Sequence, residues 1–583
     1  MTSTIEPIRR RARRRAAAVI LSALAASACG DAGAQQPAVV ASASPAPPAF
    51  AGIADPDVAA TVTTVVGSAH HPELKWPDIP DVAPMLKDLY AVEPDGLFWF
   101  DGTAPNPHVG AIVKGLALAD EHGLPRADYD ADRLAERWKT LRSGAEVEPA
   151  QRALFDLALS ACVSRLISAV HVGRVDPATL SWGYDIAPKR MDRAAALREL
   201  RDGGDLQQAL ALREPPFTHY ARARRVLARY QAAAAHEPPP VPSLEKGRKK
   251  VEPGQPWEGA AALAARLRVF GDLTGDAPAD VYDGALVNAV KSFQRRHGLE
   301  ADGVIGAGTI AAVDVTLAHR VRQIELAMER MRWLPQMSDR PTVFVNVPLY
   351  RMWATDPGAG QEPLRMNVVV GKSVDHKTPI FIDRMEYVIF RPYWNPPYGI
   401  TVKEIIPRAR KDASYFGREN LEIVASGDDD APALPPTPEN LSHVLSGRLH
   451  IRQKPGPKNS LGLAKFIFPN SENIYMHGTP AQSLFSRARR DFSHGCIRLE
   501  DPARFAEWVL RDQPEWGREE IDKAMQGTRP TRVNLKEPLS VILFYDTVHV
   551  NSEGVLFFVD DIYGHDRQLD AALRQGYPYP TKG

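Results

Sequence analysis

Residues 474–510 read IYMHGTPAQSLFSRARRDFSHGCIRLEDPARFAEWVL, and no other stretch of the chain is as informative. This segment places His477 upstream of the hexapeptide SHGCIR, residues 493–498, with fifteen residues between them. Gly495 stands directly before Cys496 and allows an unusual backbone turn, because glycine has no Cβ. The layout therefore suits a cysteine nucleophile that is presented by a tight turn.

The residues after Cys496 predict a well-anchored helix. Asp501 can accept hydrogen bonds from N–H groups of the first turn, and Pro502 suits the first helical position. A free thiol with a pKa of about 8.5 is only slightly ionised at neutral pH, so a partner imidazole is required. The backbone N–H groups of Gly495 and Cys496 can converge on a developing oxyanion.

Several alternatives remain open on the residues alone. Cys496 could be a small buried residue with surface histidines nearby. His477, His494 and Cys496 could bind zinc, although no carboxylate general base accompanies them at metalloprotease spacing. A papain-like protease is disfavoured because its cysteine precedes its histidine, whereas His477 comes first here.

Composition excludes several classes of protein. The 583 residues suggest about four structural units. Lys plus Arg equals Asp plus Glu, 71 against 71, which argues against a protein held on nucleic acid by a large positive field. Three cysteines, Cys29, Cys162 and Cys496, exclude a disulfide-stapled scaffold and a four-cysteine metal site.

The N-terminus predicts export. Residues 1–28 combine a basic segment with a short apolar stretch, as in a secretory signal peptide. Ala26–Cys29 resembles a bacterial lipobox, which would put a lipid on Cys29; cleavage after Ala34 without a lipid is the alternative. We expect an exported protein of the periplasm or cell envelope, with contact to the membrane only through a lipid on Cys29.

The next 300 residues are expected to be linkers and helices. An Ala/Pro-rich tether over 29–85 is followed by a helical scaffold domain over 86–236, in which Cys162 packs as an inert core thiol. A proline-rich linker occupies 237–256, a compact helical unit 257–316, and an amphipathic connecting helix 317–340.

Strand patterns dominate the remainder of the chain. Runs rich in β-branched and aromatic residues at 342–354, 366–372 and 386–394 predict strands, and residues 551–554 predict a hairpin loop. The expected fold is therefore multidomain, with helical units followed by a mostly β domain over 341–540 and a C-terminal hairpin and tail over 541–583.

The motifs resemble two known families. His477 together with SHGCIR resembles the signature of the L,D-transpeptidase catalytic domain of the YkuD type. Further motifs are similar to the large YcbB-like subclass, which has scaffold and peptidoglycan-binding domains: RPYWNPP (391–397), QKPGPKNSLG (453–462) and KFIFPN (465–470). The pattern from Phe293 to Thr309 resembles the three-helix peptidoglycan-binding domain.

The resemblance implies a mechanism and a set of site residues. Cys496 would be the nucleophile, His477 the acid/base, and Gly478 the residue whose carbonyl orients His477. The residues expected to shape the site and its oxyanion hole are Ser493, His494, Gly495, Arg498 and Tyr475. The resemblance implies no cofactor and no metal.

The resemblance also implies a substrate and a capping lid. The enzyme would form 3→3 cross-links between diaminopimelate residues through a cysteine thioester, with peptidoglycan tetrapeptide stems as donor and acceptor. Other wall-synthesis enzymes are expected partners, and nucleic acid is not. Residues of about 400–452, including the acidic loop 428–430, would form the lid. An L,D-carboxypeptidase using the same site and an inactive wall-binding protein are the alternatives.

Overall fold

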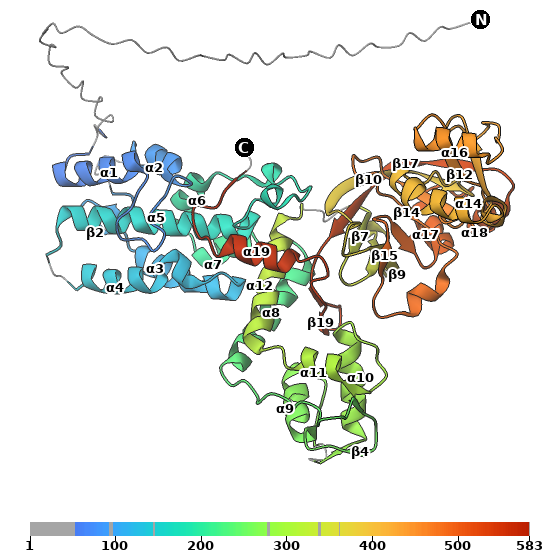
Figure 1. The fold of residues 1–583 in the computed structure, drawn as a ribbon. Coiled ribbons are helices and arrows are strands. Elements are labelled where there is room, and N and C mark those ends of the chain that lie inside the picture. Colours follow the sequence, from blue (N-terminus) through green and yellow to red (C-terminus); the bar gives the residue numbers. More distant parts are fainter. Residues whose placement is uncertain are drawn as a thin grey trace, which may run out of the picture. The chain divides into compact units, whose positions relative to one another are not determined.

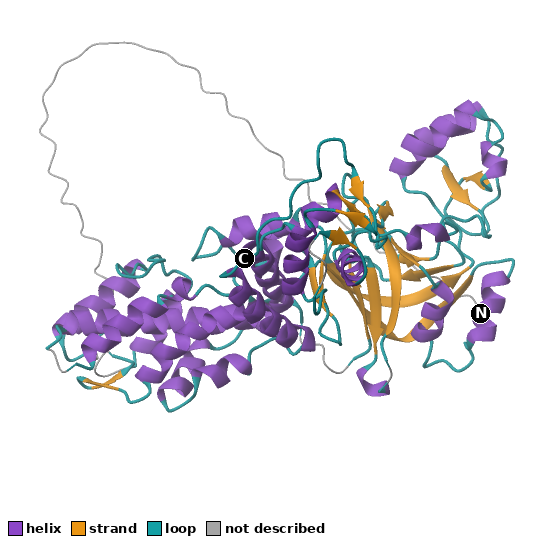
Figure 2. Cartoon of the chain, turned by 90° about the horizontal axis from the view of Figure 1, so that it is seen from below, coloured by secondary structure: helices purple, strands orange, loops and turns teal. Residues whose placement is uncertain are grey.

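The computed structural model describes residues 50, 53–92, 97–143, 146–276, 280–335, 340–360 and 362–581. The predicted signal peptide and Cys29 lie outside these residues. Helices dominate the first half of the described chain, and strands are concentrated in the second half (Figure 2). This confirms the predicted multidomain fold, with helical units followed by a mostly β domain.

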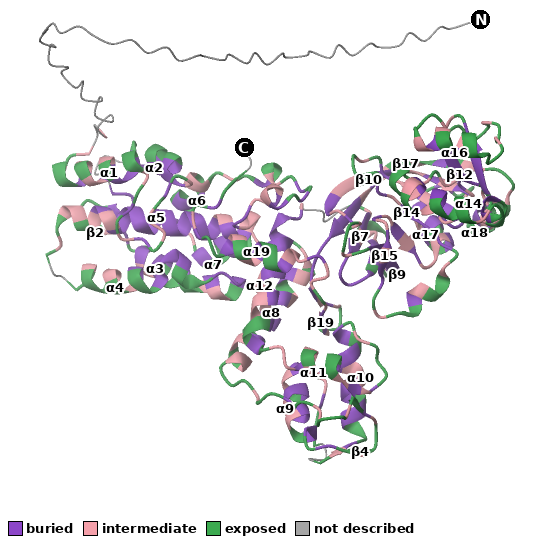
Figure 3. Ribbon diagram, viewed as in Figure 1, coloured by how far each residue is buried: buried purple, intermediate pink, exposed green. Residues whose placement is uncertain are grey.

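A helical scaffold surrounds one long central helix, α5 (Pro149–Val172), whose residues are buried over most of its length (Figure 3). Helix α5 buries side chains on all sides, begins at a proline and is capped by Gly173, which has a φ of 83°. Cys162 is buried in its core, as predicted. The other scaffold helices are α1 (Pro56–Ser68), α2 (Ala83–Tyr90), α3 (Val109–Gly115), α4 (Ala131–Leu141), α6 (Arg193–Arg201), α7 (Leu206–Ala211) and α8 (Thr218–Ala234), with a short hairpin of β1 (Phe100–Asp101) and β2 (Ala104–Pro105).

The predicted tether over 29–85 is too long at its C-terminal end. Helix α1 is capped by the Asp55 carboxylate, which accepts hydrogen bonds from the N–H groups of Asp57 and Val58. Val58 and Val62 are buried in the same core as α5. The valines at helical spacing therefore add a helix to the scaffold, which the neighbouring Ala/Pro-rich sequence obscures.

The predicted compact unit over 257–316 is built from three helices and short strand pairs. Its elements are β3 (Lys250–Val251), β4 (Gln255–Pro256), α9 (Ala260–Phe270), β5 (Val281–Tyr282), α10 (Ala285–Arg296), β6 (Ile305–Gly306) and α11 (Ala307–Val313). Strand β3 pairs with β6 and β4 with β5, so the end of the predicted linker 237–256 belongs to this unit.

Helix α12 (Leu317–Trp333) follows and packs along α8. Its Glu329 is fully buried and accepts hydrogen bonds from Arg332 Nη1 at 2.9 Å, Arg174 Nε at 3.3 Å and the Val175 N–H at 3.2 Å. Burial acts to raise the pKa of Glu329, but Arg174 and Arg332 outweigh it and the pKa is lowered. This buried cluster ties α12 to the end of α5.

The second half of the chain is organised around a nine-stranded sheet in its described residues. The order is β15-β9-β16-β14-β13-β10-β17-β7-β8, and β8 also pairs with β9, which closes the sheet into a barrel-like shape. The strands are β7 (Thr342–Asn346), β8 (Arg351–Thr355), β9 (Leu364–Gly371), β10 (Phe381–Phe390), β13 (Ala464–Ile467), β14 (Met476–His477), β15 (Asp491–Ser493), β16 (Ile497–Leu499) and β17 (Thr531–Phe544). Helices α17 (Pro502–Val509) and α18 (Arg518–Gln526) lie beside them (Figure 1).

The insertion between β10 and β13 has its own hydrophobic core, made by residues such as Ile405, Phe416, Ile423 and Leu441. It contains α13 (Tyr398–Ile400), a π-helical turn (Thr401–Ile405), α14 (Ile406–Lys411), α15 (Tyr415–Arg418), β11 (Leu421–Val424), α16 (Pro438–Leu445) and β12 (His450–Gln453). The range 400–452 that the sequence assigns to a lid therefore corresponds to a small folded subdomain, which we call the lid subdomain.

The C-terminal range 541–583 differs from a simple hairpin and tail. Strand β17 continues to Phe544, so the predicted boundary at 540 cuts through the sheet. The predicted hairpin forms from β18 (Val548–Val550) and β19 (Leu556–Phe558), and its apolar residues join the core of the compact unit over 257–316. A further helix, α19 (His565–Leu573), follows it.

Among the described residues, one helix is long and apolar enough to be considered as a membrane span, namely α5. Most of that window is buried inside the scaffold, as expected for the core helix of a folded domain.

Candidate active site

The central strands of the sheet gather most of the predicted site residues. Strand β14 pairs in parallel with β16, with His477 opposite Arg498, and antiparallel with β13, with His477 opposite Lys465. Side chains alternate along a strand, so Tyr475 and Cys496, one residue before the paired Met476 and Ile497, face the same side as His477. The opposite side, with Met476 and Ile497, is buried in the core.

The turn before Cys496 is held by its own residues. Gly495 has a φ of 116°, and a side chain there would approach Ile474 Cδ1 to 3.0 Å. The Ser493 hydroxyl donates to the Cys496 carbonyl at 2.6 Å and accepts from the Gly495 N–H at 3.1 Å. Because the Gly495 N–H is already engaged, it is a poorer oxyanion donor than the sequence suggests. Within the described residues, the N–H groups of His494 and Cys496 donate no hydrogen bond.

Residues far from the motif brace the same turn. The Thr378 hydroxyl donates to the Gly495 carbonyl at 2.7 Å, and the Tyr563 hydroxyl donates to the Gly371 carbonyl at 2.6 Å. Tyr563 also accepts from the Thr378 N–H at 3.1 Å. Burial raises the pKa of Tyr563 to about 12, so its hydroxyl remains a donor at neutral pH. The segment after β17 is therefore joined to the turn that presents Cys496.

His477 is almost completely buried, with 5% of its surface exposed. Its Nδ1 lies 2.5 Å from the Gly478 carbonyl oxygen, so Nδ1 carries the proton and Nε2 holds the lone pair. Burial, helped by Arg498, lowers the pKa of His477 to about 3 against the raising effect of the Gly478 carbonyl. The imidazole is therefore neutral at pH 7 and can accept a proton at Nε2.

Cys496 is half-buried and free. Its Sγ lies 3.9 Å from the Asn473 carbonyl oxygen, and no hydrogen bond between the described side chains of Cys496 and His477 is present. Burial raises the pKa of the Cys496 thiol, whereas Tyr475, Lys465 and Arg498 act to lower it. The resting site thus favours a neutral thiol and a neutral imidazole over a pair of thiolate and imidazolium.

Two cations and one hydroxyl surround this thiol. The Tyr475 hydroxyl is within hydrogen-bonding reach of Cys496, and burial raises the pKa of Tyr475, which keeps it protonated. The ammonium of Lys465 lies 4.0 Å from the centre of the Tyr475 ring. Burial lowers the pKa values of Lys465 and Arg498, and a charge on Cys496 opposes this for both.

His494 points to the lid subdomain. Its Nε2 lies 2.7 Å from Glu404 Oε1 in the π-helical turn, and its ring lies 4.5 Å from that of His376. Burial lowers the pKa of His494 while Glu404 acts to raise it. This side chain therefore connects the cysteine motif to the lid subdomain.

The three side chains of the zinc alternative do not form a ligand set. No group of three or more His, Cys, Asp or Glu side chains suited to a metal ion occurs within the described ranges. His477 and His494 have the Gly478 carbonyl and Glu404 as ring partners instead.

Similarity to known families agrees with this geometry. Residues 340–533 match the YkuD family, described as the L,D-transpeptidase catalytic domain. The barrel-like domain of this chain is therefore similar to the L,D-transpeptidase catalytic domain. Residues 84–227 match the scaffold domain, and residues 258–313 match the peptidoglycan-binding domain. The three domains predicted from the motifs are thus present in the predicted order.

One relative and one solved structure carry the same family name. A Haemophilus influenzae protein with L,D-transpeptidase in its name is 28% identical over 255 residues, which are 43% of this chain and 49% of the relative. The alignment therefore spans about half of the relative's length. A crystal structure of an L,D-transpeptidase from Xylanimonas cellulosilytica shares 15% identity and covers 52% of this chain and 100% of the solved chain. Its TM-score is 0.17.

Four residues around the candidate site are not identified by the sequence motifs. Lys465 lies within a quoted motif but carries no catalytic pattern, and Thr378, Glu404 and Tyr563 lie far from the motif in sequence. The strand pairing in the structure places Lys465 opposite His477. No pattern in the sequence indicates this neighbour.

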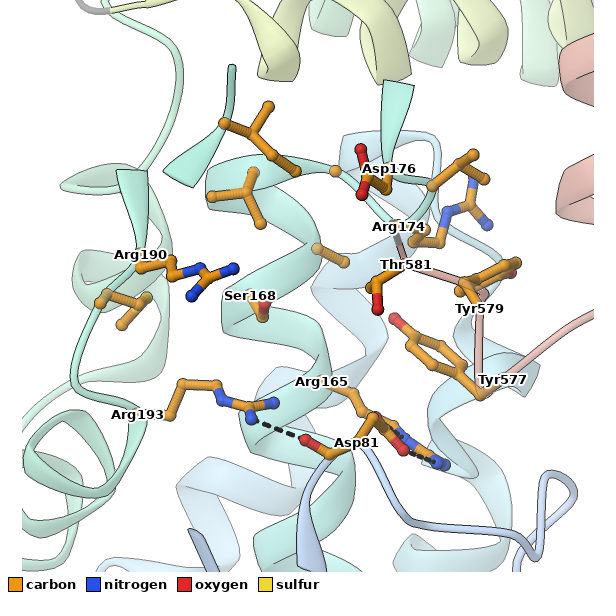
Figure 4. Close-up of a pocket in the computed structure, with 16 residues that line it drawn as sticks. Asp81, Arg165, Ser168, Arg174, Asp176, Arg190, Arg193, Tyr577, Tyr579 and Thr581 are labelled. Carbon is orange, nitrogen blue, oxygen red and sulfur yellow. Dashed lines mark hydrogen bonds and ion pairs between the residues drawn. The ribbon is translucent and has the colours of Figure 1, made fainter. Parts of the chain in front are cut away.

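A cavity of about 440 Å³ lies away from the predicted site residues, between α5 and residues 577–581 (Figure 4). Two of the arginines that line the cavity interact with Asp81 of the same chain. Arg165 pairs with the Asp81 carboxylate at 2.7 Å, and Arg193 donates to the Asp81 carbonyl at 2.6 Å. None of the residues expected to act in catalysis lines this cavity.

Proposed function

We propose that this protein is an exported peptidoglycan L,D-transpeptidase that forms 3→3 cross-links through a thioester on Cys496. The donor is a tetrapeptide stem, cleaved between diaminopimelate and the terminal D-Ala. The acceptor is the side-chain amine of diaminopimelate in a second stem. Export through the N-terminal segment, with or without a lipid on Cys29, belongs to the same proposal.

The first half-reaction forms the acyl-enzyme. Cys496 transfers its proton to the unprotonated Nε2 of His477 as Sγ attacks the carbonyl carbon of the diaminopimelate residue. The Cys496 N–H and the His494 N–H are the candidate donors to the oxyanion. The bond to the D-Ala nitrogen then breaks, and His477 returns the proton to this leaving amine.

The second half-reaction resolves the thioester. The neutral acceptor amine attacks the thioester carbon, a new amide bond forms and the C–S bond breaks. His477 takes the proton released by the amine and returns it to the departing sulfur. The hydrogen bond from Nδ1 to the Gly478 carbonyl keeps Nε2 available in both directions.

One observation carries the proposal: Cys496 and His477 lie on one face of adjacent paired strands inside a domain of the L,D-transpeptidase family. The low pKa of His477 supports a base that is neutral in the resting enzyme. The peptidoglycan-binding domain in the same chain supports peptidoglycan as the substrate.

The test is product analysis with purified disaccharide tetrapeptide. We expect a dimer joined between two diaminopimelate residues, with one D-Ala released for each bond formed. His477→Ala should lower the rate at least 100-fold, a size typical of removing a general acid/base. A disaccharide tripeptide as the main product would identify an L,D-carboxypeptidase instead, and unchanged substrate would favour an inactive wall-binding protein.

A further inference from the structure

Lys465 and Arg498 form a pair of cations on either side of His477. Lys465 on β13 and Arg498 on β16 both stand opposite His477 in the strand register, so the three side chains form a row across the sheet. Both cations interact electrostatically with Cys496. The row therefore brings two positive charges to the thiol that carries out the chemistry.

Neither cation has an acidic partner within the described ranges. The recorded ion pairs include neither Lys465 nor Arg498, and Arg498 Nε is buried without a hydrogen-bond partner. Both side chains are partly buried, and burial lowers both of their pKa values. Holding two unpaired cations partly out of water costs free energy, so their retention beside a reactive group calls for a ligand of opposite charge.

We propose that Lys465 and Arg498 form a carboxylate-binding site for the group N–Cα–COO⁻ of a D-amino acid. This inference rests on the proposed function and specifies what the site recognises. Arginine and lysine are the usual partners of carboxylates, and such charged hydrogen bonds are stronger than neutral ones. Cys496 marks the position of the reacting carbonyl, and a carboxylate one carbon beyond the reacting nitrogen lies within reach of groups around the sulfur.

The same site serves both half-reactions. The leaving D-Ala has a nitrogen, a carbon of D configuration and a carboxylate, in that order. The acceptor end of diaminopimelate has the same three groups with the same configuration. After D-Ala leaves, the acceptor therefore places its carboxylate where that of D-Ala was, which aims its amine at the thioester carbon.

This site separates true acceptors from other amines. The side-chain amine of a protein lysine has no carboxylate on the adjacent carbon, so it lacks the recognised group. A donor that continues beyond D-Ala has an amide in place of the carboxylate, so a pentapeptide stem is also disfavoured. The two cations thus select a tetrapeptide as donor and a D-amino acid centre as acceptor.

The experiment compares two free acceptors that differ only in this group. Full-length enzyme is acylated with disaccharide tetrapeptide and offered D-methionine or D-methioninamide over a range of concentrations, and the exchange products are counted by mass spectrometry. We expect wild type to prefer D-methionine by about tenfold or more in kcat/KM, from the loss of one charged hydrogen bond. Lys465→Met should reduce this preference by a similar factor, and Lys465→Arg should restore most of it.

The outcomes separate this site from the function on which it rests. Equal use of both acceptors by wild-type enzyme that forms the thioester would overturn the carboxylate site alone. A Lys465→Met enzyme that slows with both acceptors to the same extent would also overturn it, because the preference for the carboxylate would then not depend on Lys465. If no thioester forms in wild type, the proposed function fails and this site fails with it. Should Lys465→Met not fold, the wild-type ratio and Lys465→Arg decide the matter.

Discussion

At the scale of single residues, the site combines a thiol that resists ionisation with an imidazole that resists protonation. Burial is the main cause of both shifts, raising the pKa of Cys496 and lowering that of His477. A neutral resting pair protects the thiol from adventitious attack, because the thiolate is the reactive form. Under the proposed mechanism, activation depends on the substrate, whose arrival lets the proton pass to His477.

This description predicts the pH dependence of Cys496 alkylation. With iodoacetamide, the rate should rise with pH through a midpoint above about 8.5, the usual pKa of a free cysteine, because burial disfavours the thiolate. Lys465→Met should move the midpoint higher still, since a cation that favours the thiolate is lost. Stopped reactions followed by peptide mass spectrometry measure the rate. A midpoint below neutrality would indicate a preformed ion pair with His477.

At the scale of structural elements, a hydrogen bond between His494 and Glu404 connects the cysteine motif to the lid subdomain. Glu404 lies in the π-helical turn at the start of the lid subdomain, and His494 precedes Cys496 by two residues. A lid that closes on the acyl-enzyme keeps water away from the thioester and favours the amine. We therefore expect Glu404 to act as a positioning residue for the lid subdomain.

Removing this connection should change the products. Glu404→Ala should raise the ratio of tripeptide to cross-linked dimer, because water reaches the thioester more often. Glu439→Ala is the matched control, since Glu439 is an exposed carboxylate on α16 of the same subdomain. Chromatography of the muropeptide products gives the ratio. An unchanged ratio in Glu404→Ala would show that Glu404 does not affect closure of the lid subdomain.

The sequence motifs identify those site residues that lie close together in the chain. Cys496, Ser493 and Gly495 lie within one hexapeptide, and a compact motif identifies them. Tyr563 and Glu404 contribute through tertiary contacts, and neither lies in a pattern that indicates its partner. Helix α1 was missed for another reason: its valines follow an Ala/Pro-rich stretch whose composition predicts a linker.

At the scale of the whole molecule, the domains share cores and buried ion pairs. The β18–β19 hairpin packs in the peptidoglycan-binding unit, and Tyr563, a few residues later, braces the turn before Cys496. Glu329 on α12 is buried between arginines of two helical regions. The domains are therefore joined by shared packing, hydrogen bonds and buried ion pairs as well as by the chain itself.

The C-terminal brace predicts a coupled effect on activity and stability. Tyr563→Phe leaves the Thr378 N–H and the Gly371 carbonyl without their partner, at a cost of about 1–3 kcal/mol. We expect slower acylation of Cys496 together with a lower melting temperature. Tyr579→Phe, which removes a hydroxyl from the same segment, is the control and should leave acylation unchanged. Equal acylation rates in both variants would refute the brace.

The buried Glu329 predicts a larger loss of stability. Glu329→Gln removes the carboxylate that is paired with Arg332 and leaves Arg174 with only the more distant Asp128, 3.8 Å away, which should cost about 3–5 kcal/mol. Because the pKa of Glu329 is lowered in the fold, its stabilisation is complete above the ordinary carboxyl pKa and is lost as the pH falls through the lowered value. Thermal unfolding at pH 7, with Glu325→Gln on the same helix as control, measures the difference. A similar melting temperature for both variants would contradict the structural role.

The most direct test of the central claim is the mass of the protein during turnover. Full-length enzyme is mixed with disaccharide tetrapeptide without added acceptor, quenched with acid after short times, and analysed as intact protein and as peptides. The account predicts an adduct on Cys496 with the mass of the donor minus D-Ala, absent in Cys496→Ala. Release of D-Ala by wild type without any adduct on Cys496, or turnover by Cys496→Ala, would contradict it.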